Sequence, residues 1–139
     1  MCCPRSAGTA MFGGVENLIS SIMFGIPAVK GIEFGAGFAI TEMLGSQAND
    51  QYAYDENGRV VTLSNNNGGI TGGITNGMPI LFRIAVKPTP SISKPQQTVD
   101  LTKHENTELV IHGRHDPCIV PRATVVAESA LAVALINLL

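Results

Sequence analysis

The chain has 139 residues and a formal net charge of −2, which is the size of one domain and enough to bury a core. Apolar residues make up 45% and charged residues only 14%, which excludes an intrinsically disordered chain. This composition suggests that the protein buries apolar surface either by self-association or against additional polypeptide. The slight acidity gives no case for a nucleic-acid partner. Three cysteines make no disulfide framework, so a reducing, cytoplasmic location is predicted.

No apolar run reaches the roughly 20 residues that a membrane span needs, so no membrane partner is expected. The nearest candidate is 123–139, which Glu128, Ser129 and Asn137 interrupt, and a buried helix is the better interpretation. Arg5 has no apolar segment directly behind it, so we also expect no signal peptide.

In chain order, residues 1–11 carry no periodicity and predict a loose tail. A helix starts at Val15 and ends before Gly25; its apolar face is formed by Val15, Leu18, Ile19, Ile22 and Met23. A short strand follows at 29–34, and 39–44 fit either a strand or a helix. The polar segment 45–64 is predicted to project from the body of the fold as a mobile segment that can close over a ligand, with a hairpin turn at Asn57-Gly58.

The second half begins with a glycine run, 67–77, that contains a tandem Gly-Gly-Ile-Thr. Strands are predicted at 78–86 and 108–112, and a helix at 123–139 with Pro121 near its start. That helix is apolar nearly all round and must be covered on most sides, for which 139 residues are too few.

Residues 57–99 contain no acidic residue, yet these 43 positions carry Arg59, Arg83, Lys87 and Lys94. A glycine-rich, cationic stretch favours an anion site, because loop N–H groups can converge on phosphate oxygens and a lysine adds charge. Exposed turns with scattered cations explain the composition equally well. The Walker and dinucleotide motifs are absent, so a phosphate here needs another geometry.

Residues 112–118 concentrate titratable groups. A metal site from His112, His115, Asp116 and Cys118 matches no standard zinc spacing and is disfavoured. Two interpretations remain equal: an anion and acid/base site, with Arg114 binding the anion and Asp116 handling a proton, or a polar turn in which these two residues pair. Cys118 is interpreted as a buried, apolar residue.

Several long motifs occur here in the order found in the chorismate synthase family. They are 29–38, 45–50, 67–77, 87–91 (Lys-Pro-Thr-Pro-Ser), 97–101 and 113–118. The chain resembles only the C-terminal part of that family, over residues 12–139, and 1–11 form an unmatched tail. The resemblance implies an α/β fold of the α+β type, with antiparallel sheet and flanking helices, as the C-terminal part of the family's β-α-β sandwich.

The resemblance also implies a function. Chorismate synthase uses reduced FMN to eliminate phosphate from 5-enolpyruvylshikimate 3-phosphate, and it is a homotetramer. The positions that match its flavin-binding residues are Ala28, Gly72, Lys87, Pro88, Thr89, Pro90, Ser91 and Arg114. Arg114 also matches a substrate arginine, and Asp116 an aspartate that manages a proton.

Pro27 departs from the family's asparagine, so only a backbone contact is expected there. The family's catalytic histidines lie in the part that has no match here, so we expect this chain to be inactive alone. The alternative is a non-catalytic flavin-binding, phosphate-binding or assembly fragment. Composition and resemblance together predict that Lys87, the glycine run and Arg114 converge around one pocket, with Asp116 at its edge.

Overall fold

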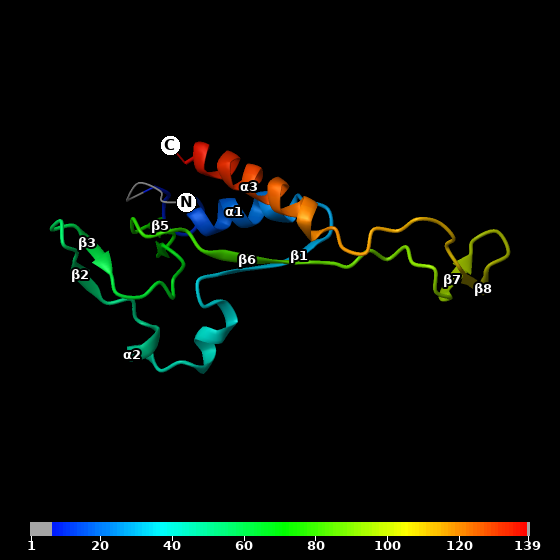
Figure 1. Ribbon diagram of the computed structural model, residues 1–139, viewed down its shortest axis with the longest axis horizontal. Coiled ribbons are helices and arrows are strands. Elements are labelled where there is room, and N and C mark those ends of the chain that lie inside the picture. Colours follow the sequence, from blue (N-terminus) through cyan, green and yellow to red (C-terminus); the bar gives the residue numbers. More distant parts are fainter. Residues whose placement is uncertain (1–6, 139) are drawn as a thin grey trace.

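The computed structural model describes residues 7–138 (Figure 1). Its helices are α1 (Val15–Phe24), the 3₁₀ helix η1 (Gly37–Glu42), α2 (Gly45–Ala48) and α3 (Val120–Ile136). Its strands are β1 (Val29–Phe34), β2 (Tyr52–Tyr54), β3 (Val60–Thr62), β4 (Ile70–Thr71), β5 (Ile74–Thr75), β6 (Phe82–Val86), β7 (Gln96–Asp100) and β8 (Glu105–Leu109). They pair antiparallel as β1–β6, β2–β3, β4–β5 and β7–β8. Helices beside antiparallel strands confirm the predicted fold class.

The core forms around α1, which packs against α3 and β1. Val15, Ile19 and Met23 lie four residues apart on one face of α1, and all three are 0% exposed. Their neighbours from elsewhere in the core are Ala7, Ile70, Ile80, Ala134 and Leu135. The helix ends just before Gly25, as the sequence predicts.

The ribbon of β1 and β6 runs alongside the two long helices (Figure 1). Phe34 pairs with Phe82 at one end, where the two rings lie 5.9 Å apart, and Val29 pairs with Val86 at the other. The pairing shifts between Val29 and Gly31, so Lys30 is an extra residue of β1, at a β-bulge, and has no paired residue on β6.

Two hairpins project from this body. The β2–β3 hairpin confirms the predicted turn at Asn57-Gly58, and Asp55 holds it by accepting bonds from the Asn57 and Arg59 N–H groups, both 2.8 Å. The β7–β8 hairpin lies at the end of a long arm (Figure 1).

The strand predicted at 108–112 is confirmed only in part, since β8 is Glu105–Leu109 and pairs with β7, a strand that was not predicted. Both strands of that hairpin are largely exposed, so no apolar alternation marks them. Asp100 instead fixes the turn by accepting bonds from the N–H groups of Thr102 and Lys103.

Two further expectations are refined by the structure. The strand predicted at 78–86 is shortened to β6, because the segment before it bonds to the glycine run: Leu81 donates its N–H to Gly68 O at 3.0 Å. The open choice at 39–44 is resolved as helical, since η1 covers most of it.

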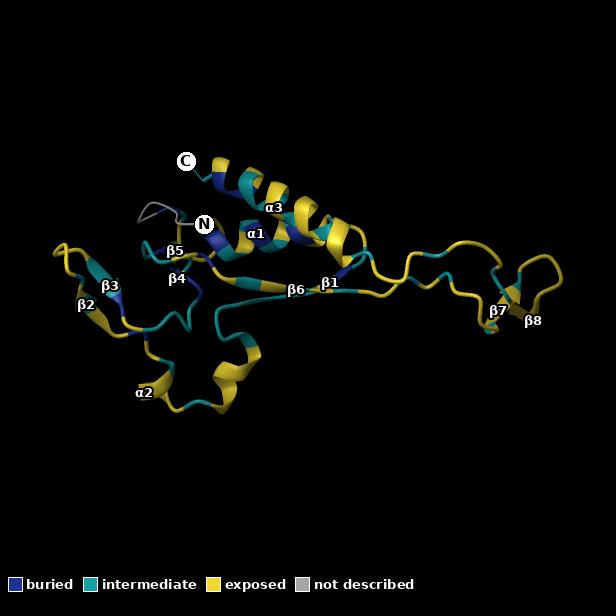
Figure 2. Cartoon of the chain, viewed as in Figure 1, coloured by how far each residue is buried: buried dark blue, intermediate teal, exposed yellow. Residues whose placement is uncertain are grey.

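α3 starts with Pro121 in its first turn, as predicted, and buries Ala134 and Leu135. Its outer face is exposed (Figure 2): Val125 is 63% exposed, Val133 53% and Ile136 70%. Among residues 7–138, no helix is long and apolar enough to cross a membrane.

Candidate anion-binding site

A hollow of about 450 Å³ lies where β1 begins and β6 ends. The residues that line it come from the turn before β1, from β1 itself, from the segment after β6 and from the start of α3. They are Ala28, Lys30, Lys87, Pro88, Thr89, Pro90 and Ile119. The hollow therefore unites three segments that are far apart in sequence.

The backbone fixes the shape of this hollow. Ala28 has a φ of 73°, a left-handed conformation that is uncommon outside glycine and often marks a functional site. Its carbonyl accepts the N–H of Lys87 at 2.7 Å, which extends the ribbon by one bond beyond Val86. Pro88 and Pro90 then restrict φ on either side of Thr89.

The hollow is cationic. Lys30 and Lys87 are exposed lysines without an ion pair among the described residues, and no carboxylate lines the hollow. By contrast, two other cations of the acid-free stretch 57–99 form ion pairs with carboxylates that lie before it in the chain. Arg59 pairs with Asp55 at 2.8 Å, and Arg83 pairs with Glu33 at 2.9 Å.

Thr89, one of the residues that line the hollow, also has an unpaired hydroxyl. Thr89 Oγ1 is buried and has no hydrogen-bond partner within residues 7–138. A buried polar atom without a partner costs about 1–3 kcal/mol, so a ligand that bonded to this hydroxyl would recover that cost. Two free ammonium groups and an unpaired hydroxyl fit an anionic group such as a phosphate.

The other residues singled out from the sequence lie outside the hollow. Ser91 follows it directly in the chain and is half-buried. Gly72 is at the tip of the β4–β5 hairpin, next to the start of α1, where Val15 donates its N–H to Gly73 O at 2.9 Å. Arg114 and Asp116 are exposed on the segment that leads back to α3.

The predicted convergence of Lys87, the glycine run and Arg114 is therefore wrong within this chain. Gly72 and Ala28 lie beyond opposite ends of α1, a helix of ten residues, which spans about 15 Å. Arg114 does not line the hollow. Adjacent strand ends would bring Lys87 and Arg114 together, but β6 and β8 belong to different sheets.

The polar turn at 112–118 does not pair Arg114 with Asp116, which was one of its two interpretations. Asp116 accepts a bond from Arg122 of α3 at 2.9 Å, rather than from Arg114. His115 Nε2 lies 3.1 Å from Ile111 O, and Cys118 is exposed rather than buried. Among the described residues, no three His, Cys, Asp or Glu side chains lie close enough to hold a metal ion.

A buried carboxylate organises the opposite end of the ribbon. Asp50 is 6% exposed and accepts four bonds of 2.7–2.9 Å, from Ser64 Oγ, the N–H groups of Asn66 and Asn67, and Asn67 Nδ2. Burial is the largest influence and raises the pKa of Asp50, but the four bonds together outweigh it and hold that pKa below its usual value. The carboxylate thus fixes the base of the β2–β3 hairpin to the start of the glycine run.

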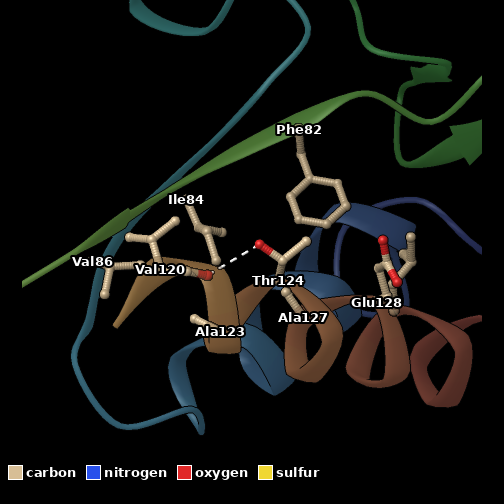
Figure 3. A pocket seen from close by; sticks show the side chains of 9 residues that line it. Phe82, Ile84, Val86, Val120, Ala123, Thr124, Ala127 and Glu128 are labelled. Carbon is tan, nitrogen blue, oxygen red and sulfur yellow. Dashed lines mark hydrogen bonds between the residues drawn. The ribbon is translucent and has the colours of Figure 1, made fainter. Parts of the chain in front are cut away.

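A second hollow, of about 360 Å³, lies between β6 and α3 (Figure 3). Phe82, Ile84 and Val86 of β6 face α3 across it. The Thr124 hydroxyl already donates to Val120 O at 3.1 Å, and Glu128 is the one charged residue of its lining. This hollow is apolar surface without the chemistry of an anion site.

Sequence reasoning missed Lys30, Ile119 and Asp50 as contributors to these sites. No sequence pattern marks the bulge at Lys30. Ile119 lies at the hollow only because the chain turns back from the β7–β8 hairpin toward α3. Asp50 was part of a recognised motif, 45–50, but its bonds to Asn66 and Asn67 depend on tertiary contacts.

The family model described as chorismate synthase matches residues 1–139. A chorismate synthase of Methanothermobacter thermautotrophicus is 49% identical over 132 residues, which are 95% of this chain and 35% of that protein. Chorismate synthase 1, chloroplastic, of Solanum lycopersicum is 50% identical over 134 residues, 96% of this chain and 30% of its own length.

A solved structure described as a crystal structure of chorismate synthase superimposes with a TM-score of 0.75 at 32% identity. It covers 99% of this chain, which in turn covers 34% of that one. The chain thus spans about a third of the length of these relatives.

Proposed function

We propose, from the premise that this chain belongs to the chorismate synthase family, that its hollow binds the phosphate of FMN. The proposed reaction of the complete enzyme is the elimination of phosphate from 5-enolpyruvylshikimate 3-phosphate to give chorismate, in the shikimate pathway. The observation that carries the proposal is a hollow lined by two free lysines and by Thr89, whose hydroxyl is unpaired, with no carboxylate among its described lining residues.

Each residue of the hollow would have a distinct role in binding. Lys87 supplies a point charge to the phosphate, and the Thr89 hydroxyl donates a hydrogen bond to one of its oxygens. Pro88 and Pro90 hold that segment in place, with Ser91 at its end, and Ala28 offers backbone contact. When bound, reduced flavin would lend an electron to the substrate as its phosphate leaves and would receive the electron back, so that there is no net redox change.

Arg114 and Asp116 are proposed at the substrate side of the site. Arg114 has no ion pair among the described residues and is free to bind an anion. Arg122 orients the Asp116 carboxylate at 2.9 Å, where it could accept a proton. Gly72 is proposed as a flavin contact of the assembled enzyme, a homotetramer, rather than of this hollow.

The chain alone is expected to be inactive, because general acid groups contribute about 10²–10⁴-fold each and the family's catalytic histidines have no match here. The test is an anaerobic assay with reduced FMN and 5-enolpyruvylshikimate 3-phosphate. Turnover close to that of an intact family member would contradict this expectation. A cytoplasmic location is proposed, although the tomato relative is chloroplastic by name.

An FMN titration of the isolated chain tests the binding proposal without requiring turnover. Lys87→Gln and Thr89→Val should each weaken binding by about tenfold, the lower end of a charge-assisted bond. Lys94→Gln is the matched control, because Lys94 is an exposed lysine of the same arm that does not line the hollow. Equal affinities in all four proteins would refute binding at this hollow, and no FMN binding by any of them would favour the alternative, an assembly fragment without a flavin site.

A further inference from the structure

We propose that Lys30 is a second binding residue of this hollow and contacts the same anionic group as Lys87. The inference rests on the proposed function, since it assigns a further cation to that site. Lys30 lies within the motif 29–38, but the resemblance gives it no role, so the inference rests on the structure.

The bulge on β1 is the first observation. Val29 pairs with Val86 and Gly31 pairs with Ala85, so two steps on β1 match one step on β6. An extra residue interrupts the regular alternation of side chains, and bulges often redirect a side chain beside an active site. Here the extra residue is Lys30, and its side chain lines the hollow together with Lys87.

The local charge balance is the second observation. Two ammonium groups that share one hollow repel each other, and no carboxylate lines it to offset them. Elsewhere on the same ribbon the cation is neutralised directly, since Arg83 bonds to Glu33 across β1 and β6 at 2.9 Å. An anion bound between Lys30 and Lys87 would supply the missing balance.

The start of α3 strengthens this field. Ile119, the residue that precedes the helix, lines the hollow and has no side chain able to cap the first turn. The positive end of a 17-residue helix therefore adds to the two lysines and the Thr89 hydroxyl.

The rest of the lining specifies what carries the anion. Ala28, Pro88, Pro90 and Ile119 present apolar surface around the charged groups. A phosphate monoester with a flat, apolar body would bury that surface, whereas inorganic phosphate would use only the lysines and the Thr89 hydroxyl. The ligand class is therefore a phosphorylated aromatic compound, and FMN and inorganic phosphate are the two probes.

The test titrates FMN and phosphate into the full 139-residue chain and into Lys30→Gln, Lys30→Arg, Lys87→Gln and Lys94→Gln. We expect Lys30→Gln to weaken both ligands about fivefold to tenfold at 50 mM salt, and less at 500 mM, because salt screens exposed charges. Lys30→Arg should retain most of the affinity, and Lys94→Gln all of it. Circular dichroism identifies any variant that does not fold, and Lys30→Met, which also removes the charge, replaces Lys30→Gln in that case.

The outcomes separate this inference from the proposed function. If Lys87→Gln weakens FMN binding and Lys30→Gln does not, the role of Lys30 is wrong and the flavin site stands. If Lys30→Gln weakens binding with the salt dependence described, Lys30 is a binding residue. If the wild-type chain binds neither probe at millimolar concentration, the anion hollow itself is refuted, and the inference with it.

Discussion

Replacement of Asp50 by asparagine should release the glycine run from the β2–β3 hairpin. Asn keeps one oxygen, which can serve Ser64 Oγ and the Asn66 N–H, the two donors on Asp50 Oδ1. Its NH₂ group replaces Oδ2 and faces the two donors of Asn67. Two hydrogen bonds to a charged group are lost. Each contributes roughly 1.5 kcal/mol, the lower end of the range for such bonds, so the expected loss of stability is about 3 kcal/mol.

The assay is urea denaturation combined with hydrogen exchange of the peptides that cover 64–81. Asp50→Asn should lower the free energy of unfolding and speed exchange in 64–71, while the β7–β8 arm stays unchanged. Asp55→Asn is the matched control: Asp55 holds the tip of the same hairpin, and the bond from the Arg59 N–H is the main cause that lowers its pKa. If the two variants behave alike, the reasoning about Asp50 is refuted.

The same bonds give a pH dependence with a defined sign. The pKa of Asp50 is lowered in the folded protein, so its contribution is fully present above the pKa of an unfolded Asp, about 4, and is lost as pH falls through the folded value. The stability difference between wild type and Asp50→Asn should therefore be constant from pH 7 to pH 5 and shrink below pH 4. A difference that instead grew on acidification would contradict this assignment.

Two further predictions concern packing. Gly68→Ala should destabilise the fold by about 4 kcal/mol in urea denaturation, because φ is +64° and a Cβ would lie 2.5 Å from Gly35 N and Leu81 O. Gly58→Ala, with φ +73° and nothing within 4 Å, should cost only about 1–2 kcal/mol, and equal costs would refute the close-approach argument. The exposed apolar face of α3 predicts self-association of the chain in light scattering, reduced by Val125→Lys with Val133→Lys. A wild-type chain that stays monomeric would contradict that prediction.

The sequence was most informative where one face is buried. α1 follows from the spacing of Val15, Ile19 and Met23, and the β2–β3 turn from Asn57-Gly58. The β7–β8 hairpin could not be found in this way, because an exposed hairpin held by turn bonds at Asp100 leaves no apolar pattern.

The candidate site was predictable only in part. The segment 87–90 was identified from its motif, and the structure adds the neighbours that no pattern encodes. The position of Lys30 at the hollow depends on a one-residue register shift between β1 and β6. The position of Ile119 there depends on where the long arm leads back to α3. Composition and the family resemblance group Gly72 with Lys87, but the two residues lie apart in space, because Gly72 is next to the start of α1 and Lys87 follows the far end of β6.

The central claim is that an anionic ligand binds at the junction of β1, β6 and α3. An NMR titration of the ¹⁵N-labelled chain with FMN tests it most directly. We predict backbone shifts concentrated at Ala28, Lys30, Lys87, Thr89 and Ile119, with little change at Gly58 on the distant hairpin. Shifts confined to Phe82, Thr124 and Glu128 of the apolar hollow, or no shifts at millimolar FMN, would contradict the claim.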